Sequence, residues 1–280
     1  MAVRKRHFKI DAKNIEKSQN DSLHFFYFCK MKKITTKIAL LSLILQFSFT
    51  ACSTYRSLDQ ALANPLDVKT LKIKNTPIGE LPPEIGTLKN LETLYLFRDQ
   101  LTSLPKEIGE LKNLETLILS SNRLTTLPAE IGDLDRLTKL SLKHNDIKNL
   151  PVEIAKLGNL EYLDLQYNEL DSLPPELGRL KELKFLYLNN NDLYSIPSQI
   201  GGLESLQYLV IGKNSLTNLP EEIGNLTTLI ELNLAYCGPM VEIPSSIVNL
   251  KSLEYLIIDR SLYLPYTINS INPRLQVVVR

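Results

Sequence analysis

Leucine and isoleucine recur along this 280-residue chain at a fixed spacing that begins near residue 65 and continues to the C-terminus. Segments aligned on the motif Leu-Pro-x-x-Ile-Gly start at residues 65, 88, 111, 134, 157, 180, 203, 226 and 250, so that seven consecutive intervals measure 23 residues. A constant period of this size indicates one small unit that is stacked many times. The length of the chain therefore does not indicate how many domains it has, because a stacked core grows by addition of units.

The apolar alternation inside each unit predicts one short strand. In the unit that begins at residue 111, Leu117 and Leu119 are two residues apart, so their side chains point to one face of a strand. Thr116, Ile118 and Ser120 then point to the opposite face. We expect strands of successive units to pair in parallel, with the leucines facing inward and the alternate residues lining an outer, concave face.

An asparagine follows the strand in most units, where the chain leaves the sheet. Backbone groups at such a turn need partners, and an Asn side chain can bond those of the neighbouring unit. We expect a structural ladder in which the loss of one buried member costs about 1–3 kcal/mol. The ladder residues are Asn122, Asn145, Asn168, Asn191 and Asn214. The residues that replace Asn in other units are Thr76, Asp99, Cys237 and Ser261.

The segment after the Asn returns the chain to the next unit. Leu124 and Leu127 are expected to fill the core, and Pro128 suits the first position of a short helical turn because its missing N–H is not needed there. Ile131 is expected to pack inward, and Gly132 to permit the turn back. An acidic residue in the first turn suits the helix dipole, and we interpret it as structural. The residues concerned are Glu107, Glu130, Glu153, Glu176 and Glu222.

Residues 111–133 match the pattern L-x-x-L-x-L-x-x-N/C-x-L at every position. The repeats resemble those of bacterial leucine-rich-repeat proteins with Leu-Pro-x-x-Ile-Gly units, over more than three quarters of the chain. The resemblance implies an α/β repeat solenoid over residues 65–280: a horseshoe with a concave parallel β-sheet and short 3-10, helical or irregular convex segments. It also implies that the concave face binds a protein partner.

The sequence before the repeats has the order of a secretory signal: basic residues 31–37, an apolar run over 38–45, and residues 46–52 ending in Phe-Thr-Ala-Cys. This ending resembles the lipobox of bacterial lipoproteins, with Phe where Leu, Val or Ile is usual. The resemblance implies a signal peptide over residues 31–51 and lipid on Cys52. We therefore expect the protein at the cell envelope or surface, held to the membrane by that lipid.

Residues 1–30 would form a polar extension in front of such a signal, so Met31 rather than Met1 is expected to be the true start. A transmembrane helix is the first alternative, but it needs about 20 apolar residues, and the uncharged stretch over 38–52 is shorter. The second alternative keeps the segment and places the chain in the cytoplasm, where it resembles the Ras-group leucine-rich-repeat proteins that scaffold signalling. Lipid labelling that depends on Cys52 distinguishes these interpretations.

The two ends of the repeat array depart from the pattern, as caps do. Residues 52–64 have apolar residues at helical spacing, and the pattern ends at Pro65. These apolar residues are Tyr55, Leu58, Ala61 and Leu62. We expect a helical cap that covers the open edge of the first strand. At the other end, the apolar strand expected over residues 275–279 has little sequence left to cover it, which favours a homodimer through this edge.

Charge and residue types limit the classes of function. Residues 1–51 hold 10 Lys and Arg against 3 Asp and Glu, whereas the rest of the chain holds 22 against 28, a net charge of −6. An acidic body without a basic stripe argues against nucleic-acid binding. The sequence offers no Ser-His-Asp constellation, metal-spaced His/Cys cluster or Gly-rich phosphate loop, so we expect no enzyme, metal or cofactor. Cys29, Cys52 and Cys237 leave no pair for a structural disulfide.

Aromatic residues are concentrated at the outward strand positions. Tyr162, Phe185 and Tyr208 occupy the same position in three successive units, and such side chains are common anchors in interfaces. The partner-binding candidates are Tyr95, Phe97, Tyr162, Asp164, Phe185, Tyr187, Tyr208 and Tyr255. The alternative is that aromatic residues are good strand residues whose neighbouring rings shield one another. Replacing the column of three rings together distinguishes these interpretations.

Overall fold

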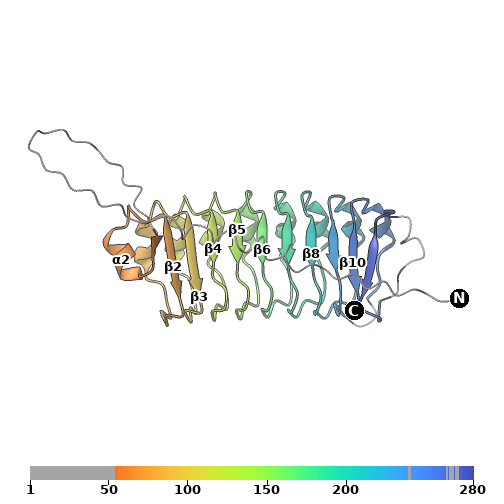
Figure 1. Ribbon diagram of the computed structural model, residues 1–280, viewed down its shortest axis with the longest axis horizontal. Helices are drawn as coiled ribbons and strands as arrows, with labels where there is room; N and C mark the ends of the chain where they lie inside the picture. The colour runs from red at the N-terminus through yellow and green to blue at the C-terminus, as the bar shows by residue number, and fades with distance from the viewer. Residues whose placement is uncertain (1–53, 239–240, 263, 265–267, 269–270) are drawn as a thin grey trace, which may run out of the picture. The chain divides into compact units, whose positions relative to one another are not determined.

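The computed structural model describes residues 54–238, 241–262, 264, 268 and 271–280. These residues build one sheet of eleven parallel strands, which follow each other in the order of the sequence (Figure 1). The expectations for residues 1–30, residues 31–51 and Cys52 lie outside the described residues. The strands are β1 (Thr54–Tyr55), β2 (Thr70–Lys74), β3 (Thr93–Phe97), β4 (Thr116–Ile118), β5 (Lys139–Ser141), β6 (Tyr162–Asp164), β7 (Phe185–Tyr187), β8 (Tyr208–Val210), β9 (Glu231–Asn233), β10 (Tyr255–Ile258) and β11 (Gln276–Val279).

The constant repeat length keeps equivalent residues in register across the sheet. Leu117 pairs with Leu94 on one side and with Leu140 on the other. A slip of one residue would turn every inward leucine to the opposite face, so the buried leucines hold this register. The fold predicted from the repeat, an α/β solenoid with a parallel sheet on its concave side, is therefore confirmed.

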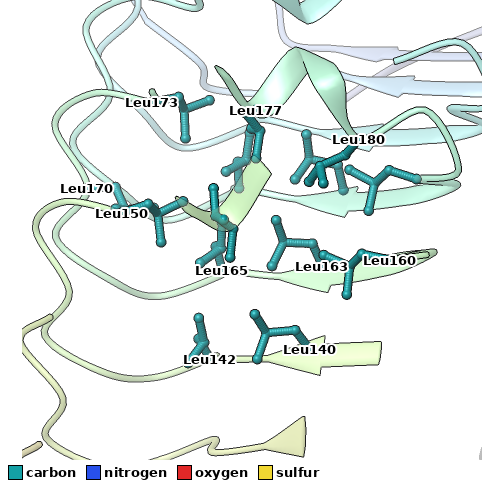
Figure 2. Packing of buried hydrophobic residues seen from close by; sticks show 14 of the residues in the cluster. Leu140, Leu142, Leu150, Leu160, Leu163, Leu165, Leu170, Leu173, Leu177 and Leu180 are labelled. Atoms are coloured by element: carbon teal, nitrogen blue, oxygen red, sulfur yellow. The ribbon is translucent and has the colours of Figure 1, made fainter. Parts of the chain in front are cut away.

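The inward leucines form a continuous core between the sheet and the return segments. Figure 2 shows Leu140 and Leu142 of one unit beneath Leu163 and Leu165 of the next, and all four side chains are fully buried. Replacing such a leucine by Ala costs about 2–5 kcal/mol, because the core does not collapse fully into the space left behind. The outward residues of the sheet are thus carried on strands that the core holds in place.

Short 3-10 helices form the return side of the units. They are η1 (Pro83–Thr87), η2 (Lys106–Glu110), η3 (Ala129–Asp133), η4 (Val152–Lys156), η5 (Pro175–Arg179), η6 (Ser198–Gly202), η7 (Glu221–Asn225) and η8 (Ser245–Asn249). Pro128 directly precedes η3 in an extended conformation, with φ −68° and ψ 151°, instead of occupying its first position as predicted. The ring of proline fixes a φ that suits this extended residue equally well.

Gly132 serves close packing between units, and the prediction that it permits a turn was wrong. Its φ is not positive, and the helix that contains it ends at the next residue, Asp133, followed by Leu134 with φ −84°. A Cβ atom added at Gly132 would overlap the carbonyl oxygen of Glu153 in the next unit. Glycine is required here because η3 and η4 approach each other more closely than a side chain allows.

The ladder asparagines join each turn to the preceding unit. Asn122 Oδ1 accepts hydrogen bonds from the N–H groups of Asp99 at 2.9 Å and Leu101 at 3.2 Å. Its Nδ2 donates to the carbonyls of Leu96 at 3.0 Å and Leu119 at 2.9 Å. The bonds to residues 21, 26 and 3 positions earlier recur at Asn145, Asn168, Asn191 and Asn214. These bonds pair backbone groups that the end of the strand would otherwise leave without partners.

The residue before the ladder position has a left-handed backbone conformation, with φ between 55° and 62°. For a residue other than glycine this conformation costs about 1–2 kcal/mol. In the units with a ladder asparagine, the bonds of the following residue hold the turn at which the chain leaves the sheet. The residues with this conformation are Asn75, Arg98, Ser121, His144, Tyr167, Asn190, Lys213 and Tyr236.

The N-terminal cap differs from the one predicted. Helix α2 spans only Leu58–Ala63, and Tyr55 lies before it in β1. Tyr55 pairs with Leu71 of β2, so a strand rather than the helix covers the edge of the first repeat strand. The apolar spacing at Tyr55 fits a helix, but pairing with the exposed backbone of β2 satisfies more hydrogen bonds at this end. In the described ranges, no helix is long and apolar enough to cross a membrane.

Candidate protein-binding face

The structure divides the eight predicted partner-binding residues into three groups. Tyr95 and Phe97 lie together on β3, with ring centroids 6.1 Å apart. Tyr255 stands on β10 and is 39% exposed. The other five belong to β6, β7 and β8, and are Tyr162, Asp164, Phe185, Tyr187 and Tyr208.

Four rings on these three strands form what we call the aromatic cluster: Tyr162, Phe185, Tyr187 and Tyr208. Phe185 and Tyr208 are stacked, with centroids 5.0 Å apart and planes inclined by 11°. Tyr162 lies 6.1 Å from the centroid of Phe185 and 5.5 Å from that of Tyr187. The rings meet because neighbouring parallel strands are about 4.8 Å apart and equivalent positions are in register. All four are half-buried, so each ring keeps an accessible part on the concave face.

Asp164 is buried beside this cluster, in register with Tyr187 on the neighbouring strand. Only 6% of the residue is exposed. Its Oδ1 accepts a hydrogen bond from the N–H of Gln166 at 3.1 Å, and its Oδ2 accepts one from the hydroxyl of Tyr162 at 3.3 Å. Burial raises the pKa of the Asp164 carboxyl, and the Gln166 N–H and Lys143 oppose this increase. Asp164 therefore contributes to this face through its charge and through its bond to the hydroxyl of Tyr162.

A second carboxyl group borders the cluster at Glu231 on β9. Glu231 pairs in register with Tyr208 and is half-buried. Burial raises the pKa of Glu231, whereas the charge of Arg280 lowers it. Burial also raises the pKa of Tyr187 to about 12, with further contributions from the charges of Glu231 and Asp164. The hydroxyl of Tyr187 thus lies in a region of negative potential.

Cationic side chains lie on the N-terminal side of the cluster. The Nζ of Lys139 is 4.8 Å from the ring centroid of Tyr162, within the range of a cation–π interaction. The Nζ of Lys143 is 5.5 Å from the ring of Tyr167, and that ring stacks on His144 at 4.1 Å. Burial, together with the charge of Lys143, lowers the pKa of His144.

Sequence analysis did not select Lys139, Glu231, Lys143 or His144 as parts of the site. The signal was present for the first two, because both stand at the repeat position that Tyr162, Phe185 and Tyr208 occupy. The sequence does not give the side-chain directions that place Lys139 over the ring of Tyr162.

The Tyr95 and Phe97 pair forms a separate aromatic patch. The guanidinium carbon of Arg98 lies 5.0 Å from the ring centroid of Phe97. Strands β4 and β5 separate this patch from the aromatic cluster. The two patches are therefore separate along the same face.

The chemistry of this face suits binding. Within the part of the chain that the structure describes, no group of three His, Cys, Asp or Glu side chains is placed to hold a metal ion. Half-buried rings, two desolvated carboxyl groups and neighbouring cations offer stacking, hydrogen bonding and charge pairing to another molecule.

The parallel sheet, the asparagine ladder and the outward aromatic residues define a repeat solenoid. The outward strand residues form one extended face on it. The chain belongs to the leucine-rich-repeat proteins, since the family model of the leucine-rich repeat region matches residues 41–146, 137–212 and 198–277. Proteins of this family generally bind protein partners, and they are typically interaction modules without enzymatic activity.

Solved structures with the same fold include bacterial proteins. A leucine-rich-repeat protein of Leptospira interrogans is 32% identical, with 81% of this chain and 76% of that chain covered and a TM-score of 0.59. The leucine-rich-repeat domain of the type III effector XopL is 26% identical, with 74% and 75% covered and a TM-score of 0.65. An internalin of Listeria monocytogenes, at 16% identity, 80% and 70% coverage and a TM-score of 0.64, shares the fold alone. No curated protein matches the sequence.

Proposed function

We propose that this protein binds a protein partner through its concave face, with the aromatic cluster at the centre of the contact. The observation that carries this proposal is the set of four half-exposed rings gathered on adjacent strands of the sheet. Exposed aromatic residues on a rigid surface lose little conformational entropy on binding and are enriched in interface hot spots. The core beneath the strands supplies that rigidity.

The test is affinity capture by the full chain and by a triple variant, Tyr162→Ala, Phe185→Ala and Tyr208→Ala. A partner that the wild type captures should be lost from the triple variant, because truncated hot-spot residues commonly cost 2 kcal/mol or more each (~30-fold in affinity). Circular dichroism should show that the triple variant keeps its fold, since the three side chains lie outside the leucine core. Unchanged capture would refute the role of the cluster.

A matched control is available outside the sheet. Tyr194 and Tyr236 are exposed by 61% and 54% and do not belong to the aromatic cluster. The double variant Tyr194→Ala and Tyr236→Ala removes comparable aromatic surface, and it should capture the partner as the wild type does.

We further propose that the repeat domain is displayed at the cell envelope, anchored by lipid on Cys52. The sequence order of basic, apolar and small residues that ends at Cys52 supports this location. Metabolic labelling with a fatty-acid analogue should mark the wild type, which should be recovered with membranes, and Cys52→Ser should abolish both. A cytosolic, unlabelled wild type would instead favour an intracellular scaffold.

A homodimer through β11 is proposed as an additional association. Val277, Val278 and Val279 of this edge strand are exposed by 37%, 37% and 55%, and unpaired strand edges with apolar side chains favour pairing with another chain. Sedimentation at increasing concentration should show a dimer that Val278→Lys disrupts. A wild type that stays monomeric at high concentration would remove this proposal.

A further inference from the structure

We propose that the aromatic cluster receives an Arg or Lys side chain of the protein partner, which lies over Tyr187 and Tyr208 between Asp164 and Glu231. This inference rests on the proposed function, because it specifies the chemistry of the partner at the same face. It requires negative charge on both sides of the rings, no competing cation above them, and rings that are partly exposed.

The two carboxyl groups flank the rings on opposite sides. Asp164 on β6 pairs in register with Tyr187 on β7, and Glu231 on β9 pairs with Tyr208 on β8. Burial raises the pKa of each carboxyl, which means that removal from water disfavours its charged form. A cation placed between them would favour both charged forms, so part of the desolvation cost already present in the free protein would be recovered on binding.

The strands between the carboxyl groups carry neutral outward residues. Those residues are Phe185 and Tyr187 on β7 with Asn189 after it, and Tyr208 and Val210 on β8 with Gly212 after it. The cations that act on the carboxyl groups lie to either side, with Lys143 toward Asp164 and Arg280 toward Glu231. Lys184, which precedes β7, is paired with Glu161 at 3.0 Å. A positive group of the partner would therefore meet two negative charges before it meets a positive one.

The ring faces favour a cation over an apolar or acidic group. Lys139 and Arg98 already make such contacts on this face, at 4.8 Å from Tyr162 and 5.0 Å from Phe97. In the ranges that the structure describes, no Lys or Arg is placed over the rings of Tyr187 or Tyr208. A metal ion is not favoured, because the carboxyl groups lie on strands three positions apart and form no ligand set.

The experiment titrates the full chain, labelled with ¹³C at the tyrosine rings, with arginine amide or with citrulline amide, its neutral isostere. Arginine amide should shift the Tyr187 and Tyr208 signals saturably, and citrulline amide should bind at least tenfold more weakly. The double variant Asp164→Asn and Glu231→Gln should lose that preference. Both substitutions keep the size of the side chain, and circular dichroism checks the fold of the variant.

Glu115→Gln with Glu182→Gln is the matched control, since it removes two exposed carboxylates outside the cluster and should bind arginine amide as the wild type does. Equal binding of both amides to the wild type, or undiminished binding of arginine amide to the Asp164→Asn and Glu231→Gln variant, would overturn the inference. The proposed function is judged separately by partner capture with the triple alanine variant. Capture that needs the rings but not the two carboxyl groups would leave the proposed function standing and the inference refuted.

Discussion

Asp99 stands at a ladder position but carries a carboxyl group where most units have an amide. This difference predicts how a substitution at Asp99 changes the stability of the protein. Its Oδ1 accepts the N–H of Thr76 at 2.9 Å, as the Oδ1 of Asn122 accepts the N–H of Asp99. Its Oδ2 then takes the place of the amide nitrogen, and this atom is buried without a hydrogen-bond partner in the described part of the chain. By the offsets seen at Asn122, an amide nitrogen at this position would donate to the carbonyls of Ile73 and Leu96, of which Leu96 already accepts one bond from Asn122 Nδ2.

Replacing Asp99 by Asn supplies an Nδ2 group that can donate to these carbonyls, without a change in size. A buried polar group without a partner costs roughly 1–3 kcal/mol, and each hydrogen bond formed contributes about 0.5–1.5 kcal/mol. We therefore expect Asp99→Asn to raise the free energy of unfolding by about 1–3 kcal/mol at pH 7. In a domain of this size each kcal/mol raises Tm by about 2–4 °C.

The gain should depend on pH. Burial raises the pKa of the Asp99 carboxyl, while the N–H of Thr76 acts in the opposite direction. A carboxyl with a raised pKa holds its proton more tightly in the folded state than in the unfolded chain. Its contribution to stability is present below the unfolded pKa and is lost as pH rises through the folded pKa. The advantage of Asp99→Asn is therefore smallest near pH 4 and grows toward neutral pH.

Urea unfolding followed by circular dichroism between pH 4 and pH 8 measures this difference. Asn122→Asp provides the reverse exchange at the next ladder position, and it should destabilise the protein at pH 7 by a similar amount. An Asp99→Asn protein that is no more stable than the wild type at pH 7 would refute the reasoning. So would a gain that is the same at pH 4 and pH 7, because it would not come from the ionisation of the carboxyl.

Three further predictions concern the repeat packing and the cluster. Gly132→Ala should destabilise the protein by about 1–3 kcal/mol through overpacking against Glu153. Gly158→Ala should not, because a Cβ atom there meets no atom within 4 Å. Equal effects of the two substitutions in urea unfolding would contradict this prediction. Asn168→Ala should cost about 1–3 kcal/mol, and hydrogen exchange should increase first in the adjoining turns. Tyr187 has its pKa raised to about 12, so its contribution to stability falls as pH rises from about 10, the unfolded value, through the folded value. Tyr187→Phe should remove part of this alkaline loss in urea unfolding, and an unchanged pH profile would contradict the assignment.

The inward leucines of the strands and the asparagine ladder follow from the sequence. Leu117 and Leu119 alternate with the half-buried outward residues Thr116, Ile118 and Ser120, and the spacing of 23 residues leaves one register in which such leucines of successive units face the same side. Asn122 follows the strand at a position where its side-chain amide bonds backbone groups of two units at once. These features depend on residue type and spacing, which the sequence contains in full.

Contacts between units were harder to predict. Gly132 looked like a turn residue, yet its role comes from the backbone of the next unit, and Pro128 stands just outside the helix that it was expected to begin. Tyr55 had helical spacing with α2 but joined the sheet because β2 offered an unpaired edge. In these cases the conformation of the residue depends on a neighbouring unit or strand, and tertiary packing sets how close that neighbour lies.

For the candidate site, the sequence by itself determined which residues face outward, because alternation along a strand depends on chain geometry alone. Only the tertiary structure decided which of them meet: it joined Tyr162, Phe185, Tyr187 and Tyr208, left Tyr95 and Phe97 apart, and buried Asp164 beside the rings. The physical reason is that desolvation and ring contacts depend on side-chain directions across several strands, and no spacing within one unit encodes them.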